Sequence, residues 1–217
     1  TLESIDLRKN NIEKEFSMPV QWVNRSSSDF RGYSGTIVSG FVEKGMSIKF
    51  LPSSQSSTVK EIIGPNGSIE KAIVGQSITI TLDTEVDISR GDVFLSKNNN
   101  DIILADQFAA HLIWMDNKKM LPERNYILRF INSYVTGQVT DLTHSININS
   151  YEEVATKTLK LNEIGYCKIA LNKAIPFTSY KNNSHLGSFV FIDQFTNQTI
   201  GAGMIDHALR RASNISW

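Results

Sequence analysis

The sequence predicts an all-β protein built from two small β-barrels. Three observations lead to this expectation: apolar residues alternate with other residues in short runs, turn-forming residues separate the runs, and long amphipathic helical patterns are missing. Short strands with such regular punctuation are typical of antiparallel sheets that close into barrels. Because no amphipathic helix long enough to alternate with the strands is found, a doubly wound α/β fold is not expected.

Alternation of apolar and other residues is clearest in four segments. Side chains on a strand point to opposite faces in turn, so each segment is expected to bury one set of residues. The four segments are residues 78–82, 108–114, 126–130 and 167–171. Turn-rich pieces at residues 52–54, 64–67 and 182–184 are expected to separate strands.

Helix is expected only in short pieces. Residues 1–9 read as the end of a helix, while residues 151–158 and 206–213 each read as a single helical turn. None of these pieces is long enough to cover a sheet, so the fold class remains all-β.

The polar run at residues 96–101 is the predicted boundary between two strand-rich halves of similar length. We expect residues 15–99 to form the first barrel and residues 101–206 the second. Residues 1–14 and 207–217 are then expected to be linkers at the two ends.

Composition excludes several functional classes. The chain has 217 residues, with 22 basic against 22 acidic side chains, so it lacks the excess of positive charge that nucleic acids or anionic membranes attract. Its single cysteine, Cys167, permits no internal disulfide and no structural four-ligand zinc site based on cysteine pairs. We expect a cytoplasmic protein that binds neither nucleic acid nor membrane.

Two fragments imitate nucleotide-binding motifs without their essential residues. Residues 40–47 have the glycine spacing of a P-loop, but Met46 stands where a lysine would reach the phosphates, and a strand-like stretch follows instead of a helix. Residues 29–32 match the Asp-x-x-Gly pattern but precede the false P-loop, the reverse of the order in GTPases. We therefore expect a glycine-bounded connection between strands at residues 40–47.

The remaining candidates for chemistry also have structural explanations. Asn117 and Asn172 begin motifs that resemble a guanine-reading sequence but lack its aspartate, so turns are expected at both. The histidines have no metal-ligand spacing and Cys167 alternates with apolar residues, which favours sheet histidines and a buried thiol. Glu152 and Glu153 are expected to be solvated. The sequence thus nominates no catalytic, cofactor-binding or metal-binding residue. The histidines are His111, His144, His185 and His207.

Several phrases, in order along the chain, resemble the barrels of translation-factor GTPases. The stretches MPVQWVNR at residues 18–25 and DFRGYSGTIVSG at residues 29–40 resemble the start of the second domain of elongation factor Tu-like proteins. EVDISRGD at residues 85–92, LKLNEIG at residues 159–165 and IGAGMI at residues 200–205 are similar to the large, GTPase subunit of bacterial sulfate adenylyltransferase. The two barrels are thereby identified with domains II and III of this fold.

The resemblance implies a role in a larger enzyme. That enzyme joins ATP and sulfate into adenosine 5′-phosphosulfate for sulfate assimilation, with GTP hydrolysis on the large subunit and adenylyl transfer on a separate small catalytic subunit. GTP and Mg²⁺ are expected in a GTPase domain upstream of residue 1, and no cofactor within these residues. The tail at residues 208–217 resembles a connector to an adenylylsulfate kinase domain, as in bifunctional members of the family. The implied partners are therefore the small subunit, the chain's own GTPase domain and a fused kinase domain.

Two alternatives stay open from the sequence. One is a pair of tRNA- or RNA-binding barrels from a translation factor, and the other is a free-standing β-barrel hydrolase. In the favoured interpretation the chain is inactive alone, and it positions the GTPase domain and contacts other subunits. Asn162 and Glu163 are expected either to form an exposed contact or to cap a turn. Six glycines are expected to serve backbone geometry: Gly32, Gly35, Gly40, Gly45, Gly91 and Gly165.

Overall fold

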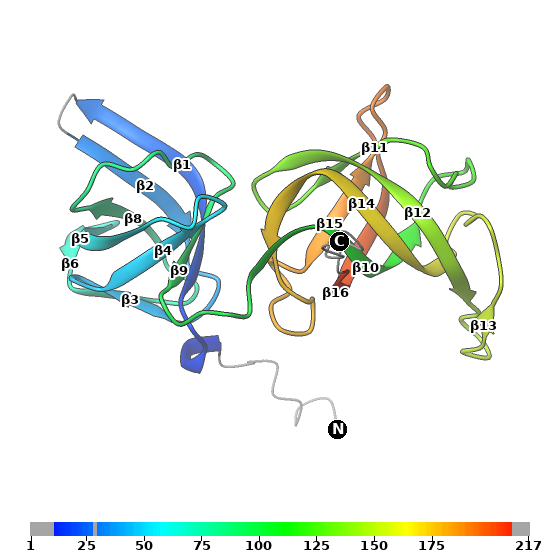
Figure 1. The fold of residues 1–217 in the computed structure, drawn as a ribbon, viewed down its shortest axis with the longest axis horizontal. Helices are drawn as coiled ribbons and strands as arrows, with labels where there is room; N and C mark the ends of the chain where they lie inside the picture. The colour runs from blue at the N-terminus through cyan, green and yellow to red at the C-terminus, as the bar shows by residue number, and fades with distance from the viewer. Residues whose placement is uncertain (1–10, 28–29, 210–217) are drawn as a thin grey trace, which may run out of the picture. The chain divides into compact units, whose positions relative to one another are not determined.

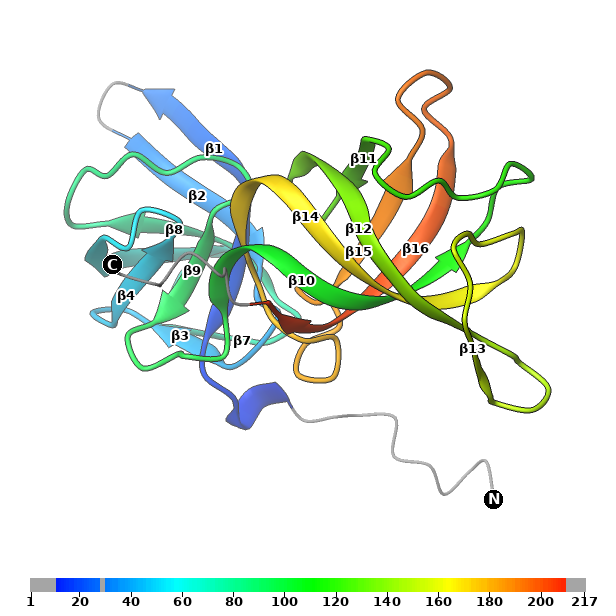
Figure 2. The same ribbon diagram turned by 45° about the vertical axis from the view of Figure 1, so that its right-hand side comes forward.

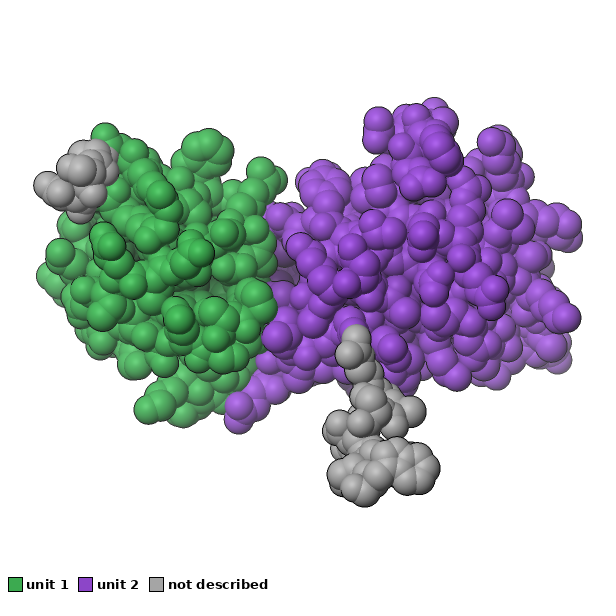
Figure 3. Space-filling view, turned by 45° about the horizontal axis from the view of Figure 1, so that its top comes forward, with its two compact units in different colours: residues 1–99 green, residues 100–217 purple. Residues whose placement is uncertain are grey.

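The structure is a computed structural model that describes residues 11–27 and 30–209. Backbone contacts divide the chain into two compact units, Thr1–Asn99 (unit 1) and Asn100–Trp217 (unit 2), which Figure 3 shows in different colours. The helix predicted at residues 1–9 and the Asp29 position lie outside the described residues.

Unit 1 is a closed barrel of six antiparallel strands (Figure 1). The closed sheet has the order β4-β9-β1-β2-β8-β5, and pairing of β4 with β5 closes it. The short strand β6 is added beyond β5. A separate two-stranded ribbon is formed by β3 and β7. The strands are β1 (Ser17–Ser27), β2 (Phe30–Thr36), β3 (Phe41–Glu43), β4 (Ser47–Leu51), β5 (Ser56–Gly64), β6 (Gly67–Ile69), β7 (Lys71–Ile73), β8 (Ser77–Leu82) and β9 (Val93–Ser96).

Unit 2 is a second closed barrel of six antiparallel strands, in the order β11-β15-β16-β10-β14-β12, with β13 added beyond β12. Pairing of β11 with β12 closes it. The long strands β10, β12 and β14 curve along one side of the barrel, as Figure 2 shows. The strands are β10 (Ile103–Trp114), β11 (Tyr126–Arg129), β12 (Tyr134–Ile146), β13 (Glu153–Val154), β14 (Ile164–Phe177), β15 (Ser188–Ile192) and β16 (Thr199–Ala208).

The alternation predicted from the sequence is confirmed, because the alternating apolar residues fill the two barrels. In unit 1, Ile78 and Ile80 are buried with Tyr33 and Phe94, whose rings meet edge to face at 5.5 Å. In unit 2, Phe108 lies at the centre of an aromatic core. Its ring contacts those of Phe130, Phe177 and Phe189 at centroid distances of 6.1, 5.3 and 5.3 Å.

Two of the helical turns predicted from the sequence are wrong. Within residues 151–158 the chain forms β13, whose Val154 pairs with Ser145 of β12. Residues 206–208 continue β16, and the Leu209 amide donates to the Gln107 carbonyl, so strand pairing replaces the expected turn. Both segments are short, and pairing with a neighbouring strand decides their conformation over local preference. The described residues contain one 3₁₀ turn, η1 (Asn11–Glu13), and no α-helix.

The polar run at residues 96–101 packs more closely than its composition suggests. Ser96 and Asn99 are buried, and the Asn99 side-chain amide donates to the Phe16 carbonyl at 3.1 Å. Lys49 donates to the Asn99 carbonyl at 2.6 Å. Buried polar groups need hydrogen-bond partners, and these hydrogen bonds hold the last residues of unit 1 against its own barrel.

Two physical causes explain the six glycines. Gly40 has a φ of +67°, and a Cβ there would lie 2.5 Å from the Lys14 carbonyl oxygen. Gly35 has no left-handed backbone, but a Cβ there would lie 2.4 Å from the Pro19 carbonyl oxygen, which is closer than packed atoms approach. The expected backbone role is confirmed for the glycines with positive φ. The other positions require glycine because neighbouring atoms lie too close to leave room for a Cβ. Positive φ is found at Gly40, Gly45 and Gly91, and close approach alone at Gly32, Gly35 and Gly165.

No helix among the described residues is both long and apolar enough to cross a membrane.

The aromatic core of unit 2 gives the first testable prediction. Phe108→Ala is expected to lower the free energy of unfolding of unit 2 by about 3–5 kcal/mol, because it empties a site that three other rings surround. Denaturant unfolding followed by tryptophan fluorescence measures this change, since Trp114 is buried in the same core. Phe195→Ala, at a side chain that is 77% exposed, is the control and should change stability by less than about 0.5 kcal/mol. Equal effects of the two substitutions would contradict the prediction.

Candidate functional site

The segment that imitates a P-loop is part of the unit 1 barrel. It runs from Gly40 through β3 and a turn at Gly45 into β4, and the Gly45 amide donates to the Val59 carbonyl at 2.8 Å. A phosphate-binding loop needs free amides at the start of a helix, whereas here a strand follows. The expected connection between strands is confirmed.

The other motif-bearing residues are dispersed over the strands and turns of unit 2. Asn117 lies in a bend as expected, but the turn predicted at Asn172 is wrong, because this residue lies within β14 and accepts a hydrogen bond from the Thr136 amide. Cys167 is fully buried as expected, and burial raises the pKa of its thiol to about 12. Glu152 and Glu153 are both exposed.

Asn162 and Glu163 cap a turn. Asn162 has a φ of +64°, and the Glu163 carboxylate accepts a hydrogen bond from the Lys160 amide at 2.8 Å. Asparagine tolerates the left-handed region better than most residues do, and the carboxylate satisfies an amide that the turn leaves free. Of the two roles expected for this pair, the structure supports turn capping.

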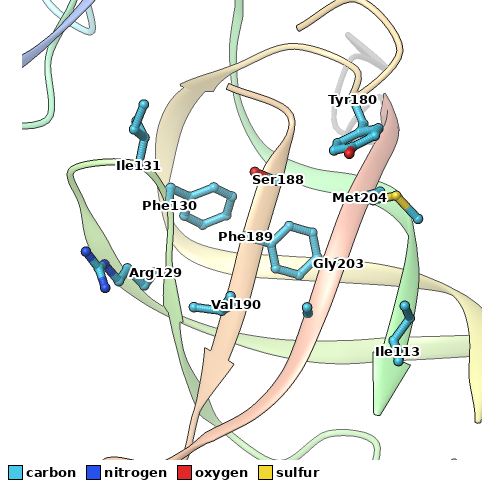
Figure 4. A pocket seen from close by; sticks show the side chains of 11 residues that line it. Ile113, Arg129, Phe130, Ile131, Tyr180, Ser188, Phe189, Val190, Gly203 and Met204 are labelled. Atoms are coloured by element: carbon cyan, nitrogen blue, oxygen red, sulfur yellow. The ribbon is translucent and has the colours of Figure 1, made fainter. Parts of the chain in front are cut away.

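An apolar depression of about 450 Å³ lies on the outer face of unit 2, and we call it the β15–β16 hollow. Figure 4 shows Arg129 and Ile131 on one side of β15, with Ile113 and Met204 on the other side and Tyr180 at one end. Its other wall residues are Phe130, Ser188, Phe189, Val190, Ala202 and Gly203.

The floor of the β15–β16 hollow depends on a glycine. Gly203 pairs with Phe189 across the sheet, and a Cβ at Gly203 would lie 2.1 Å from the Phe189 ring. The Phe189 ring fills the space that a side chain at residue 203 would need, and it packs in the core against Phe130 and Phe191. The depression therefore has a rigid floor that belongs to the same core as the rest of the barrel.

A row of outward-facing side chains crosses the sheet from this hollow. Pairing places Ser188 beside Met204, Met204 beside His111, His111 beside Tyr166 and Tyr166 beside His144. The Tyr166 ring meets His111 edge to face at 5.0 Å and stacks on His144 at 5.6 Å. We call these five residues the cross-strand row; it joins an apolar hollow to a polar aromatic patch.

Hydrogen bonds fix the polar end of the row. The Tyr166 hydroxyl donates to the Asp206 carboxylate at 2.8 Å, and His207 Nδ1 lies 2.9 Å from the same oxygen. Partial burial and the hydrogen bond to Asp206 raise the pKa of Tyr166 to about 12. The hydrogen bonds from Tyr166 and then His207 lower the pKa of Asp206. These hydrogen bonds favour the ionised form of Asp206 and hold its carboxylate in place. Nearby, His144 Nδ1 lies 3.5 Å from the Glu153 carboxylate.

These features suit binding better than catalysis. A general acid or base works best with a pKa near the working pH, and the pKa of Tyr166 lies far above it. The Cys167 thiol is buried and protonated, so it is a poor nucleophile. Within the ranges 11–27 and 30–209, no three histidine, cysteine, aspartate or glutamate side chains gather to hold a metal ion.

Residues 107–206, most of unit 2, match the family model described as GTP-eEF1A C-terminal domain-like. The bifunctional enzyme NodQ of Rhizobium sp. strain N33 is 43% identical over 216 residues, which is 100% of this chain and 33% of NodQ. Sulfate adenylyltransferase subunit 1 of Pseudoalteromonas atlantica is 40% identical over 210 residues, 97% of this chain and 45% of that protein.

Over nearly its whole length, the chain is thus similar to sulfate adenylyltransferase subunit 1 and to NodQ. It spans about a third to less than a half of the length of these relatives. The resemblance seen in the sequence phrases is thereby confirmed.

Solved structures confirm the predicted fold class. Sup35 in complex with GDP superposes with a TM-score of 0.82, over 96% of this chain and 51% of that one. The identity is only 16%, so the likeness concerns the two-barrel fold alone. The expected match to domains II and III of elongation-factor-like GTPases is borne out.

The sequence reasoning missed both the β15–β16 hollow and the cross-strand row. Alternation places His111 and His144 on strands, but only the register between strands brings them to the two sides of Tyr166. A signal was present at outward positions of β10 and β16, where Ile113, Ala202 and Met204 are apolar.

The polar end of the row gives a prediction about pH. Tyr166→Phe is expected to raise the pKa of Asp206 toward its ordinary value, because it removes the strongest hydrogen bond to the carboxylate. A carboxyl group with a lowered pKa in the folded state stabilises the fold at pH values above its unfolded-state pKa. This contribution is lost as the pH falls through the folded-state pKa, so Tyr166→Phe should make the free energy of unfolding less sensitive to acid. NMR titration of the Asp206 carboxyl measures the change.

The raised pKa of Tyr166 has the opposite effect on how folding stability depends on pH. Its raised pKa favours the folded state below pH 10, and this contribution is lost as the pH rises from 10 toward about 12. The control is Tyr134→Phe, an exposed tyrosine on β12 outside the cross-strand row. If the pKa of Asp206 were the same in wild type and Tyr166→Phe, the hydrogen-bond explanation would be wrong.

Proposed function

We propose that this chain is the two-barrel part of the GTP-hydrolysing subunit of a sulfate adenylyltransferase. The full enzyme would couple GTP hydrolysis to synthesis of adenosine 5′-phosphosulfate from ATP and sulfate, in sulfate assimilation. The observation that carries the proposal is 40% identity with a sulfate adenylyltransferase subunit 1 over 97% of the chain. Similar identity with NodQ, a bifunctional enzyme, supports an additional fused kinase domain.

The role of the two barrels in this enzyme is to position other parts and to contact them. GTP and Mg²⁺ bind in the GTPase domain, and adenylyl transfer occurs on the small catalytic subunit. The β15–β16 hollow and the cross-strand row form the contact surface for that small subunit. In support, the hollow is apolar and eight of its eleven wall residues lie on β10, β11, β15 and β16, so most of this surface is already ordered before a partner binds.

The translation-factor alternative shares the fold, and the Sup35 likeness supports only that shared part. The balance of 22 basic and 22 acidic residues gives RNA little electrostatic attraction. RNA binding that weakens steeply with salt would favour the alternative over our proposal.

The contact surface leads to a prediction about assembly. In the full-length subunit, Val190→Arg is expected to weaken binding of the small catalytic subunit at least about tenfold, because it places a charge in an apolar contact. Ile73→Arg introduces the same charge at a partly exposed apolar residue of unit 1 and is the matched control. Titration of the two purified subunits by calorimetry measures both. Wild-type affinity in Val190→Arg would move the contact elsewhere without affecting the proposal that the chain is part of such a subunit.

Because the proposal places GTP hydrolysis in the GTPase domain and not in the two barrels, it leads to a prediction about activity. Residues 1–217 alone are expected to hydrolyse neither GTP nor ATP above the blank rate, because the described residues offer no phosphate-binding loop. Phosphate release from the purified chain is the measurement. Turnover that stays proportional to this chain through successive purification steps would contradict the proposal and revive the β-barrel hydrolase.

A further inference from the structure

The β15–β16 hollow carries its charge at one edge. Arg129 is the only charged residue among the eleven that form the hollow. It is the last residue of β11 and is exposed. Figure 4 shows its side chain on one side of β15, with Ile113 and Met204 on the other side. The hollow therefore combines an apolar wall with a cation at its edge.

Strand register places Arg129 on the same face of the sheet as the apolar wall. Arg129 pairs with Val190 of β15, and Val190 pairs with Ala202 of β16. Ala202 in turn pairs with Ile113 of β10. Residues paired directly across antiparallel strands point to the same side, and here the three apolar residues are half-buried, while Leu128 next to Arg129 is fully buried in the core. A line of apolar side chains on the outer face thus ends at a cation.

The Arg129 guanidinium has an aromatic neighbour but no anionic one. Tyr134 pairs with Arg129 across β11 and β12, and the guanidinium carbon lies 5.7 Å from the centre of the Tyr134 ring. Among the residues that the structure describes, no ion pair includes Arg129. A guanidinium beside a ring keeps its N–H groups at its own edge, so they remain free to donate to a carboxylate.

The surroundings of this line of side chains do not neutralise the cation. The register places Tyr134 beyond one end of the line and Ile164 beyond the other, and neither is acidic. Asp206 of β16 already accepts a hydrogen bond from the Tyr166 hydroxyl at 2.8 Å. The hollow therefore presents a positive edge, which attracts a negatively charged group on a partner.

This lining fits one class of partner better than others. A free phosphate or sulfate would contact Arg129 and leave the apolar wall uncovered. A nucleic acid needs a row of cations, and the hollow has one. A polypeptide can offer an apolar side chain and a carboxylate together. Protein interfaces commonly have this arrangement, with an apolar centre and charges at the rim.

We propose that the small catalytic subunit inserts an apolar side chain over Val190 and Ala202 and places an aspartate or glutamate carboxylate against Arg129. This inference rests on the contact surface proposed above, and it adds the chemistry of the partner residues. Because Arg129 is exposed at the edge, the ion pair acts chiefly on the rate at which the subunits associate. Opposite charges steer the encounter, and salt screens them.

Charge reversal in the full-length large subunit tests the ion pair. Arg129→Glu is expected to lower the association rate constant with the small subunit about tenfold and to change the dissociation rate constant less than about threefold. Lys173→Glu is the matched control, because it makes the same change in net charge at an exposed position of β14 outside the hollow. It should change both rate constants less than about twofold. Stopped-flow fluorescence of a labelled small subunit measures the rates.

Salt dependence provides a second measurement with milder substitutions. The association rate of the wild-type subunits is expected to fall as the salt concentration rises. Arg129→Gln should make this fall shallower than Lys173→Gln does, because it removes the charge that faces the partner. An equal salt dependence in the two variants would contradict the ion pair.

Charge exchange identifies the residue on the partner. Exposed acidic residues of the small subunit are replaced one at a time by lysine, and each variant is mixed with wild-type and Arg129→Glu large subunits. One lysine variant is expected to associate faster with Arg129→Glu than with the wild type, because the two charges of the pair have been exchanged. If no variant does so, the inference is wrong.

The outcomes distinguish this inference from the proposed function. Equal association rates for Arg129→Glu and Lys173→Glu, with normal binding between wild-type subunits, would overturn the inference alone. Wild-type subunits that do not bind each other would overturn the inference and the proposed function together. Self-association of the large subunit that Arg129→Glu abolishes would assign the hollow to a second copy of this chain, which would also overturn the inference. Sedimentation of the large subunit alone detects that case.

Discussion

Closure of each barrel by one pair of strands is the constraint on which the rest of the structure depends. In unit 1 the closing pair is β4 and β5, and in unit 2 it is β11 and β12. Once a sheet closes, its register cannot slip at one strand without disturbing the others, because inward residues must keep filling the core. The outward residues are fixed as a consequence. The cross-strand row and the floor of the β15–β16 hollow are therefore products of closure, not of local sequence.

The sequence predicts what is local and leaves out what depends on pairing. Alternation identifies Phe108, Cys167 and their neighbours as core residues because period two is a property of a single strand. It cannot place Tyr166 between two histidines, since three strands with separate positions in the chain determine that contact. The turn predicted at Asn172 and the helical turn predicted in the segment containing β13 are wrong for the same reason. Their own residues suit a turn, and a neighbouring strand decides otherwise.

The two units place their polar groups differently. In unit 2, Tyr166, Asp206 and His207 satisfy one another at the surface, and the adjoining hollow is apolar. In unit 1, hydrogen bonds from the Tyr33 and Thr84 side chains hold the loop after β8, at the end of the barrel.

The cross-strand row has a further consequence for how the molecule is recognised. Its five members come from β10, β12, β14, β15 and β16, and no single strand contains more than one of them. A synthetic peptide copied from any one strand therefore cannot reproduce it. Antibodies raised against the unfolded chain would likewise miss it. Recognition of this line of side chains is thus a direct report that the barrel has folded and closed.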